Sequence, residues 1–490
     1  MTMAQAKLQS PGRNAVALTR PSRMSIAGKR ELVLGLGDTG LSVAKWVTRN
    51  GGQVRVADTR AQPPQLGPLR KLFPAAEARC GEFSPRLLES VDLLCVSPGL
   101  SLQETLVLEA IAAGLPVCGD IELFAWGLEE HGRGKVLAVT GTNGKTTVTS
   151  LIGHLLRGAG LDTQVAGNIA PPALDAFCDR LDSGRLPEAW VLELSSYQLE
   201  TTWSLAPDAA TMLNLSEDHL DRYPGLAAYG VAKARVFQGN GVQVLNRDDP
   251  FSLSMAVAGR KRITFSLGAP VDDADFGCIA VSGKKWIAQG HNALVAIDSL
   301  PIHGWHNAAN AMAALAMARA ICVPYEPLVK SVATFRGLPH RLERVATING
   351  VDFYDDSKGT NVGATIAALK GIATQGSRAG LDRPVILIAG GVGKGQDFGP
   401  LAQPVAEHAR KVFLIGEDAQ HIEAAIAPAR VPVERCATLE GAVNRAAQEA
   451  RAGEVVLLSP ACASFDMFRN YKHRGEVFAA AVRGLRPNHG

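Results

Sequence analysis

The chain has 490 residues, about three times the ~150 residues of a usual domain, so two to four domains are expected. Hydrophobic residues make up 47% and charged residues 20%, a balance that excludes global disorder. The net charge of +3 is too small a surplus to indicate nucleic-acid binding. Eight cysteines without a CxxC pair favour a reducing compartment over a disulfide framework. Because no apolar run reaches the ~18–20 residues of a spanning helix, we predict a cytoplasmic protein without membrane insertion.

Residues 1–29 differ in composition from the rest. They are basic, contain no acidic residue, and hold Pro11 and Pro21, which interrupt any helix. An organelle-targeting segment has this composition, but amphipathic periodicity is missing. A disordered basic tail over residues 1–29 is therefore favoured.

From Glu31 onward, short β-rich runs alternate with helical stretches, which is the pattern of parallel α/β layers. Breaker-rich segments at 131–134 and 336–339 divide this pattern into three series. We therefore predict an α/β protein with domains at 30–133, 134–337 and 338–490. The predicted strands are 32–37, 54–58 and 93–96, then 136–140, 189–194 and 210–215, then 351–354, 385–389, 412–415 and 455–458.

The strongest local signal is the segment TGTNGKTT at residues 140–147, between a predicted strand and a helix. Its glycines allow backbone N–H groups to surround phosphate oxygens, and the helix N-terminus adds its positive dipole end. Lys145 would reach the terminal phosphates and Thr146 would hold Mg²⁺. The spacing is two residues shorter than the common phosphate loop, because Val139 stands where the first glycine is expected. Lys-Thr-Thr directly behind the glycines favours nucleotide binding over a tight structural turn.

A second glycine pattern, GLGDTG at residues 35–40, follows the first strand, and Asp58 ends the second strand. Taken alone, this arrangement indicates a dinucleotide-binding crossover in which the acid receives ribose hydroxyls. A loop for another phosphate-bearing nucleotide and a purely structural turn both remain open.

Polar residues follow the strands of the second series. Glu193 lies where a phosphate-loop enzyme places a second metal-binding acid. His219 follows the next strand and should lie at the same edge of the sheet, which favours a metal or substrate ligand over a polar loop residue. Lys233 lies in a helical stretch, where a surface lysine is the default expectation.

Motifs of the third series also follow predicted strands, at the edge where open α/β sheets bind ligands. They are DDSKGTN at 355–361, GGVGK at 390–394 and SPACAS at 459–464, which leads into FDMF. Arg341, just after the second break, is suited to neutralising charge on a transferring phosphate.

These motifs resemble those of the Mur ligases of peptidoglycan precursor synthesis, in family order from Gly35 to Tyr471. The motifs that carry the resemblance are AVTGTNGKTT, GNI at 167–169, LELSSYQLE, EDHLDRY, GLPHR, DDSKGTN, GGVGK and LSPACASFDMF. The pattern is most similar to the family's D-glutamate-adding branch, because the DNPR signature of its diamino-acid-adding branch is absent.

The resemblance implies an N-terminal Rossmann-like domain for a UDP-sugar, a central P-loop ATPase domain with a mostly parallel sheet, and a C-terminal Rossmann-like domain for an amino acid. It implies an ATP-dependent ligase (EC 6.3.2.9) that adds D-glutamate to UDP-N-acetylmuramoyl-L-alanine through an acyl phosphate, releasing ADP and phosphate. ATP, two Mg²⁺ ions and a carboxylated Lys233 are the implied cofactors. We expect no nucleic-acid partner and a monomer.

The resemblance also assigns site residues. It assigns the UDP-sugar site to Asp38, Thr39, Asp58, Thr59, Arg60, Ser97, Gly99 and Asn168. It assigns the ATP site to Gly141, Thr142, Asn143, Gly144, Lys145, Thr146, Thr147, Asn310, Arg341 and Asp356. It assigns the amino-acid site to Lys358, Thr360, Lys394, Ser464, Phe465 and Tyr471. It assigns catalysis to Lys145, Glu193, His219, Lys233 and Arg341. It assigns metal binding to Thr146, Glu193, His219 and Lys233. Asp38 and Tyr471 depart from the hydrophobic residue and the phenylalanine expected there.

Three other functions are weighed against this one. An NAD-linked oxidoreductase would use GLGDTG and Asp58 but leaves the 140–147 loop unexplained. A nucleotide-regulated binding protein without catalysis does not account for Glu193, His219, Lys233 and Arg341. A related ligase, such as one that adds polyglutamate to folate, is separated by a panel of substrates.

Overall fold

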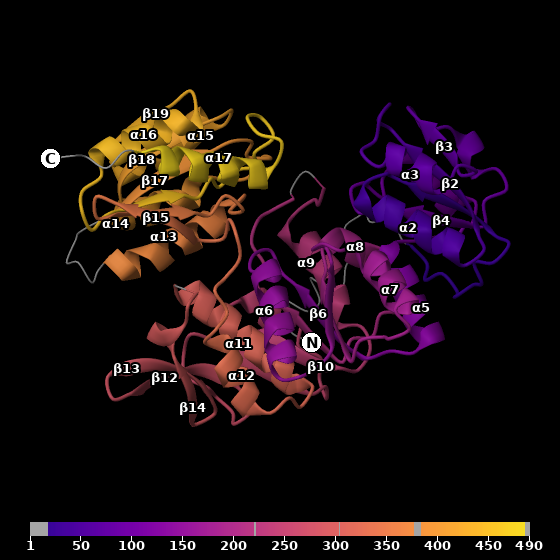
Figure 1. The fold of residues 1–490 in the computed structure, drawn as a ribbon, viewed down its shortest axis with the longest axis horizontal. Helices are drawn as coiled ribbons and strands as arrows, with labels where there is room; N and C mark the ends of the chain where they lie inside the picture. Colours follow the sequence, from indigo (N-terminus) through magenta and orange to yellow (C-terminus); the bar gives the residue numbers. More distant parts are fainter. Residues whose placement is uncertain (1–17, 220–221, 303, 377–383, 486–490) are drawn as a thin grey trace.

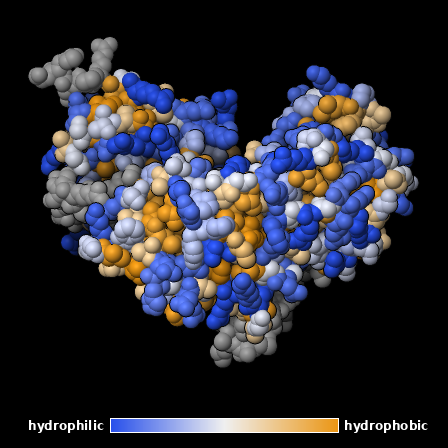
Figure 2. Space-filling view, turned by 60° about the horizontal axis from the view of Figure 1, so that its bottom comes forward, coloured by the Kyte–Doolittle hydropathy of each residue, from blue (hydrophilic) through white to orange (hydrophobic). Residues whose placement is uncertain are grey.

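The computed structural model describes residues 18–219, 222–302, 304–376 and 384–485, and the chain forms three α/β domains in succession (Figure 1). The N- and C-terminal domains stand on either side of the central domain, and Figure 2 shows the molecule hollowed between two lobes. Residues 1–17 of the predicted tail lie outside the described residues. Nearer the first strand, Ile26 is buried and Arg23 pairs with Glu130 at 3.1 Å.

The N-terminal sheet is wholly parallel, with strand order β3-β2-β1-β4-β5. The order reverses at β1, which lies between β2 and β4, so the carboxyl ends of β1 and β4 form the ligand-binding crevice of a doubly wound sheet. Its strands are β1 (Arg30–Leu34), β2 (Gln53–Asp58), β3 (Glu77–Cys80), β4 (Leu93–Val96) and β5 (Val117–Cys118). Its helices are α2 (Asp38–Arg49), α3 (Leu66–Leu72), η1 (Pro85–Leu88) and α4 (Thr105–Ala112).

The central sheet has the order β14-β13-β12-β11-β10-β9-β6-β8-β7, with β6 between β8 and β9. Its antiparallel pairs are β12–β13 and β13–β14, which form a meander that the sequence analysis did not predict. The strands are β6 (Lys135–Thr140), β7 (Thr163–Gly167), β8 (Ala189–Glu193), β9 (Ala209–Met212), β10 (Val242–Asn246), β11 (Arg262–Phe265), β12 (Phe276–Val281), β13 (Lys284–Gln289) and β14 (Asn292–Ala296). The helices are α5 (Asp120–His131), α6 (Lys145–Gly158), α7 (Ala173–Asp182), α8 (Ser196–Glu200), α9 (Leu226–Ala234), η2 (Arg235–Phe237), α10 (Pro250–Ser254), η3 (Ile297–Ser299), α11 (Trp305–Ala320) and α12 (Tyr325–Val332).

The C-terminal sheet has the order β15-β16-β20-β17-β18-β19, and only β15 is antiparallel. Every residue of β17 is buried, as expected for a parallel strand covered on both faces. The strands are β15 (Glu343–Ile348), β16 (Val351–Asp355), β17 (Val385–Gly390), β18 (Ala409–Ile415), β19 (Val433–Arg435) and β20 (Val455–Leu458). The helices are α13 (Val362–Gly376), η5 (Gly399–Leu401), α14 (Ala402–His408), α15 (Ala419–Ile426), η6 (Ala427–Ala429), α16 (Leu439–Glu449) and α17 (Tyr471–Gly484). The predicted three-domain α/β architecture is confirmed.

The first two domains share one apolar core. Trp46 of α2 packs against Phe177 of α7 with ring centroids 5.5 Å apart, and Phe124 of α5 packs edge-to-face on Trp190 of β8 at 5.1 Å. Such aromatic pairs add to the stabilisation that burial alone gives. The helix α5 follows the last strand of the N-terminal sheet but packs on α7 and α8 of the central domain, so it joins the two domains. None of the helices in the described part of the chain is long and apolar enough to cross a membrane.

Glu31 in β1 is fully buried, and neither carboxylate oxygen has a hydrogen-bond partner among the described residues. Burial, aided by Asp92, raises its pKa from 4.5 to about 7. Because the pKa of this acid is higher in the folded chain than in the unfolded chain, its titration does not reduce the free energy of unfolding below pH 4.5. As the pH rises through 7, the free energy of unfolding falls by about 3 kcal/mol.

We expect Glu31→Met to raise the melting temperature at pH 8, because an apolar side chain of similar length needs no ionisation or hydrogen bond in this core. The advantage over the native chain should shrink at pH 5, where the native carboxyl is neutral. Thermal unfolding of both chains at the two pH values measures this difference. An advantage that is the same at pH 5 and pH 8 would contradict the titration of Glu31.

Candidate functional site

The loop between β6 and α6 has the conformation of a phosphate-binding loop. Gly144 has φ +85°, and a Cβ there would lie 2.7 Å from Oδ1 of Asn310 on α11, so only glycine fits. The Lys145 ammonium turns back and donates to the carbonyl oxygens of Gly141 and Thr142, both at 2.9 Å. Burial lowers the pKa of Lys145, although Glu193 and Asp218 oppose this effect.

A cavity of about 560 Å³, here called the phosphate-loop cavity, lies beside this loop between the central and C-terminal domains. It brings together most of the residues that the sequence analysis assigned to ATP, metal and amino-acid binding. Those on its wall are Thr142, Asn143, Gly144, Lys145, Thr146, Thr147, Glu193, His219, Asn310, Arg341, Asp356, Lys358, Thr360, Lys394 and Tyr471.

Glu193 at the end of β8 is the clearest candidate metal ligand. Its side chain is 1% exposed, and Oε1 accepts a 2.8 Å hydrogen bond from Nδ2 of Asn168. The other oxygen, Oε2, is buried and has no partner among the described residues. A buried carboxylate oxygen without a donor, close to the hydroxyl-bearing loop, fits a hard divalent cation such as Mg²⁺.

His219 is held in one orientation at the wall of the same cavity. Its backbone has φ +57°, and its N–H donates to Oδ1 of Asp218 at 3.0 Å. The ring contacts Tyr197 edge-to-face at 4.9 Å. Burial lowers the pKa of His219, Asp218 opposes this, and the nearby lysines lower it further. The imidazole is therefore neutral near pH 7, the form that binds metals.

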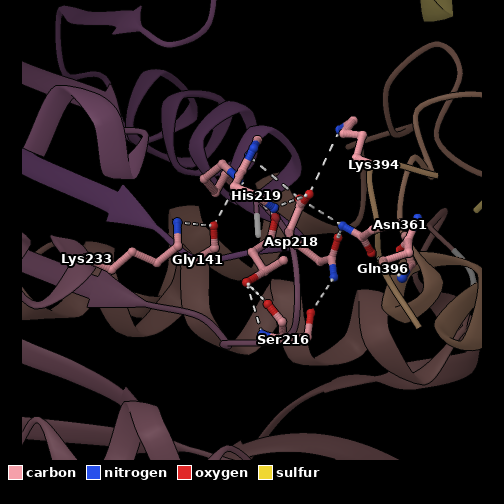
Figure 3. A network of polar contacts seen from close by, with 12 residues as sticks. Gly141, Ser216, Asp218, His219, Lys233, Asn361, Lys394 and Gln396 are labelled. Atoms are coloured by element: carbon pink, nitrogen blue, oxygen red, sulfur yellow. Dashed lines mark hydrogen bonds and ion pairs between the residues drawn. The ribbon is translucent and has the colours of Figure 1, made fainter. Parts of the chain in front are cut away.

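Lys233 is not the surface residue expected by default, because α9 packs it inward and leaves it 1% exposed. Its ammonium lies directly behind the phosphate loop and donates to the carbonyl oxygen of Gly141 at 2.8 Å (Figure 3). It also lies 4.5 Å over the ring of Tyr229. Burial, followed by the charge on Lys145, lowers the pKa of Lys233 well below its usual value. An amine in this position is poised to be neutral.

The C-terminal domain contributes further cations to the cavity. Burial lowers the pKa of Arg341, and Glu193 and Asp356 oppose this effect. The Lys358 ammonium lies 3.4 Å from the Thr146 hydroxyl and 4.8 Å over the Tyr471 ring. Burial lowers the pKa of Lys358 to about 8, and Arg341 adds to this. The cavity is thus rich in positive charge, as an anion-binding site requires.

Asp218 links the central and C-terminal domains, and sequence reasoning did not single it out. Asn361 donates from Nδ2 to Oδ2 of Asp218 at 3.2 Å and to Oδ1 of Asn143 at 3.1 Å (Figure 3). The Lys394 ammonium lies 3.9 Å from Oδ1 of Asp218. The only sequence signal was its position beside His219 in the acidic segment 217–221.

A second cavity of about 530 Å³, here called the crevice cavity, opens at the carboxyl ends of β1 and β4. Asn168 lines both cavities, so the two meet at this residue. The residues assigned to the UDP-sugar all lie on the wall of the crevice cavity: Asp38, Thr39, Asp58, Thr59, Arg60, Ser97, Gly99 and Asn168.

Asp58 braces the glycine loop of this crevice. Its Oδ2 accepts from the Leu36 N–H at 2.7 Å, and Arg60 forms a two-pronged pair with both oxygens at 2.8 and 2.6 Å. Burial would raise the pKa of Asp58, but these hydrogen bonds lower it to about 2. A Cβ on Gly40 would lie 1.9 Å from the carbonyl oxygen of Gly35, which explains the last glycine of GLGDTG by packing.

Four of the assigned residues lie outside the walls of both cavities: Gly141, Lys233, Ser464 and Phe465. Gly141 is the first residue of the loop after β6, and Lys233 lies directly behind it. Ser464 is 2% exposed, whereas Phe465 is 73% exposed. In this structure these two residues do not join the other residues assigned to the amino acid.

Family models match most of the chain. The Mur ligase MurD-like N-terminal domain matches residues 29–119, the Mur ligase middle domain residues 139–318, and the Mur ligase glutamate ligase domain residues 340–462. The UDP-N-acetylmuramoylalanine--D-glutamate ligase of Nitrosospira multiformis is 54% identical, with 94% of this chain and 97% of the relative covered. The enzyme of the same name from Nitrosomonas europaea is 52% identical, with the same coverage.

Solved structures give the same fold at low sequence identity. UDP-N-acetylmuramate-alanine ligase from Thermotoga maritima has a TM-score of 0.59 at 18% identity, with 94% of this chain and all of that chain covered. MurF from Acinetobacter baumannii has a TM-score of 0.59 at 18% identity, with 95% and 93% covered.

We expect Gly144→Ala to weaken ATP binding about tenfold or more, because the added methyl group meets Asn310 and the left-handed backbone is strained. Gly160→Ala is the matched control, since Gly160 has φ +88° with nothing within 4 Å of a Cβ and lies off the cavity. Titration of a fluorescent ATP analogue measures both variants. An equal loss of affinity for the ATP analogue in the two variants would mean that backbone strain in general, and not the geometry of the phosphate loop, weakens binding.

Proposed function

The chain belongs to the Mur ligase family, and from this premise we propose that it joins D-glutamate to the alanyl carboxylate of UDP-N-acetylmuramoyl-L-alanine, with hydrolysis of ATP to ADP and phosphate. The observation that carries the proposal is the meeting of the two cavities at Asn168. A nucleotide-sugar in the crevice cavity would extend its peptide end past Asn168 toward the phosphate loop.

The phosphate-loop cavity supplies what activation of a carboxylate needs. A carboxylate is a poor electrophile, so ATP first converts it to an acyl phosphate. The loop N–H groups and Lys145 would hold the ATP phosphates, and Arg341 would offset charge on the phosphoryl group in transit. Asn310 and Asp356 remain available for the adenosine part. Burial raises the pKa of Asp356 to about 7, although the Ser459 hydroxyl donates to it at 2.8 Å.

The residues present fit two magnesium ions, one at Thr146 and Glu193 and the other near His219 and a carboxylated Lys233. The partnerless oxygen of Glu193 and the neutral imidazole of His219 support these assignments. When bound, magnesium would screen the negative charge of the phosphate oxygens and the developing tetrahedral centre.

The C-terminal domain would hold D-glutamate through Lys358, Thr360, Lys394 and Tyr471, which share the phosphate-loop cavity. Lysine ammonium groups are natural partners for the two carboxylates of glutamate. The deprotonated amine attacks the acyl carbon, and phosphate leaves from the tetrahedral intermediate. Closing the cavity would keep water from the acyl phosphate. One chain supplies all these residues, so the proposed site needs no second copy, in agreement with a monomer. The nucleotide substrates are those of a cytoplasmic enzyme.

Phosphate release from ATP, with UDP-N-acetylmuramoyl-L-alanine and each glutamate enantiomer, tests the function. Release should require all three substrates and occur with D-glutamate only. Lys145→Ala should lower turnover at least hundredfold, a loss of about 3 kcal/mol of transition-state stabilisation, and leave UDP-sugar binding intact because Lys145 lies outside the crevice cavity. Equal release with L-glutamate, or none with either, would overturn the assignment.

The buried Lys233 gives a second test of the proposal. Carbamate formation needs a neutral amine, and the lowered pKa of Lys233 favours that form. We expect Lys233→Ala to lose most activity and Lys233→Arg to be equally inactive, because a guanidinium is not carboxylated in this way. Carbon NMR with labelled bicarbonate should report the adduct in the native chain alone. Lys330→Arg, at an exposed lysine, is the control. A fully active Lys233→Arg would reject the carbamate.

A further inference from the structure

The loop after β17 carries Lys394 to the phosphate-loop cavity on a tight turn. The N–H of Gln396 donates to the carbonyl oxygen of Gly393 at 3.3 Å, which closes a four-residue turn around Lys394 and Gly395. Both central residues have positive φ, +54° for Lys394 and +73° for Gly395. Turns of this kind favour glycine, asparagine or aspartate at the first central position, where this chain has a lysine. Such a backbone conformation persists only where the surrounding structure fixes it.

The turn is held at both of its ends. At its start, the Gly393 N–H donates to Oδ2 of Asp418 at 2.6 Å. At its end, Oε1 of Gln396 accepts from the Val362 N–H at 2.9 Å, and Nε2 donates to the carbonyl oxygen of Ala461 at 2.7 Å. A backbone N–H can only donate and a carbonyl oxygen can only accept, so the carboxamide has a single orientation. One amide therefore joins the turn to the loops after β16 and β20.

The partners of this amide lie in the loops that frame the proposed amino-acid site. Val362 begins α13, where its N–H has no partner within the helix, and it follows Thr360 and Asn361. Figure 3 shows Gln396 close to Asn361 in the polar network around Asp218. Gln396 lines neither of the two cavities, whereas Thr360 lines the phosphate-loop cavity, as Lys394 does. In this structure Gln396 thus acts on that cavity through the residues that it places.

Another side chain already holds the same loops together nearer the ends of the strands. Arg474 is fully buried and donates to the carbonyl oxygens of Ser357 at 2.9 Å and Gly390 at 3.4 Å. Ser357 lies two residues after β16, and Gly390 is the last residue of β17. The edge of the sheet is therefore fixed without Gln396. The distinct contribution of Gln396 lies further along the loops, at the turn that bears Lys394.

We propose that Gln396 is a positioning residue for amino-acid binding, which fixes the end of the 393–396 turn and so aims the Lys394 ammonium at a carboxylate of D-glutamate. The inference rests on the proposed function and extends it to a residue outside the cavity walls. An ammonium on a backbone that is fixed beforehand loses less conformational freedom when the carboxylate binds. The cost of removing Gln396 should therefore fall on affinity for the amino acid. The residues assigned to ATP and to the UDP-sugar do not lie on this turn.

Kinetics of the full chain, with each substrate varied in turn, test the proposal. Gln396→Met removes both hydrogen bonds at similar volume and should raise the Michaelis constant for D-glutamate about tenfold. Turnover and the Michaelis constants for ATP and the UDP-sugar should stay within about twofold of the native values. Gln396→Glu keeps an acceptor for Val362 but sets a carboxylate against the Ala461 carbonyl, so it should give the same pattern.

Gln403→Met is the matched control for the substitution. Gln403 is an exposed glutamine of the same domain that lies off both cavities, and its amide donates to Glu407 at 2.8 Å. All the Michaelis constants of this variant should equal those of the native chain. Melting curves of every variant show whether it is folded at the assay temperature.

A double-variant cycle with Lys394→Ala shows whether Gln396 acts through this lysine. In the Lys394→Ala chain, Gln396→Met should raise the Michaelis constant for D-glutamate less than about twofold further, because the group that it places is absent. A general structural role would instead multiply the two effects.

A native-like Michaelis constant for D-glutamate in Gln396→Met would overturn the proposal. So would an equal rise for ATP or the UDP-sugar, or full multiplication of the effects with Lys394→Ala, because the amide would then support the domain in general. If neither Gln396 variant folds, the amide is needed for the fold, which also overturns a role specific to this site. A native chain that forms no product from D-glutamate would instead refute the proposed function, so the two failures are distinguishable.

Discussion

The concentration of buried positive charge around the 140–147 loop is the constraint on which the rest of the structure depends. Lys145, Arg341 and Lys358 all have pKa values lowered by burial, which means that their charged forms are disfavoured where they stand. Glu193 and Asp218 offset part of this charge. Phosphate groups would complete the balance, because charge-assisted hydrogen bonds stabilise an anion beside these cations.

This charge is shared between domains, which explains why the cavities lie at domain boundaries. The central domain supplies the loop with Lys145, whereas Arg341 and Lys358 come from the C-terminal domain. The positively charged residues of one domain alone would not surround an anion bound in the cavity between the two domains. Asn361 and Asp218 keep the two sets together through hydrogen bonds rather than through an apolar interface. Such contacts are exchangeable with water and therefore suited to a joint that opens.

Much of the fold could be predicted because the parallel strands are continuous apolar runs bounded by glycine turns, as in β6, β8 and β17. The β12–β14 meander was not predicted because each of its strands is exposed at one end and buried only towards the other, so none is buried along its whole length. Local pattern also places residues at strand ends, which is why most of the assigned residues line a cavity. It does not tell which helix face packs inward, so the residues alone left Lys233 at the surface by default, and only the family resemblance assigned it to the site. The role of Asp218 depends on contacts across domains, which no spacing in the sequence reveals.

The apolar core shared by α2, α5, α7 and β8 reduces the ways in which the molecule can change shape. The apolar clusters of the C-terminal domain contain, among the described residues, no side chain from the other two domains. Two of the three domains thus behave as one body, and relative motion has a single joint to pass through. That joint follows Gly337, where His340 and Leu342 on either side of Arg341 have φ of +62° and +49°. A rotation about this segment would move Arg341 together with the C-terminal wall of the phosphate-loop cavity, while the crevice cavity, which the first two domains line, kept its shape.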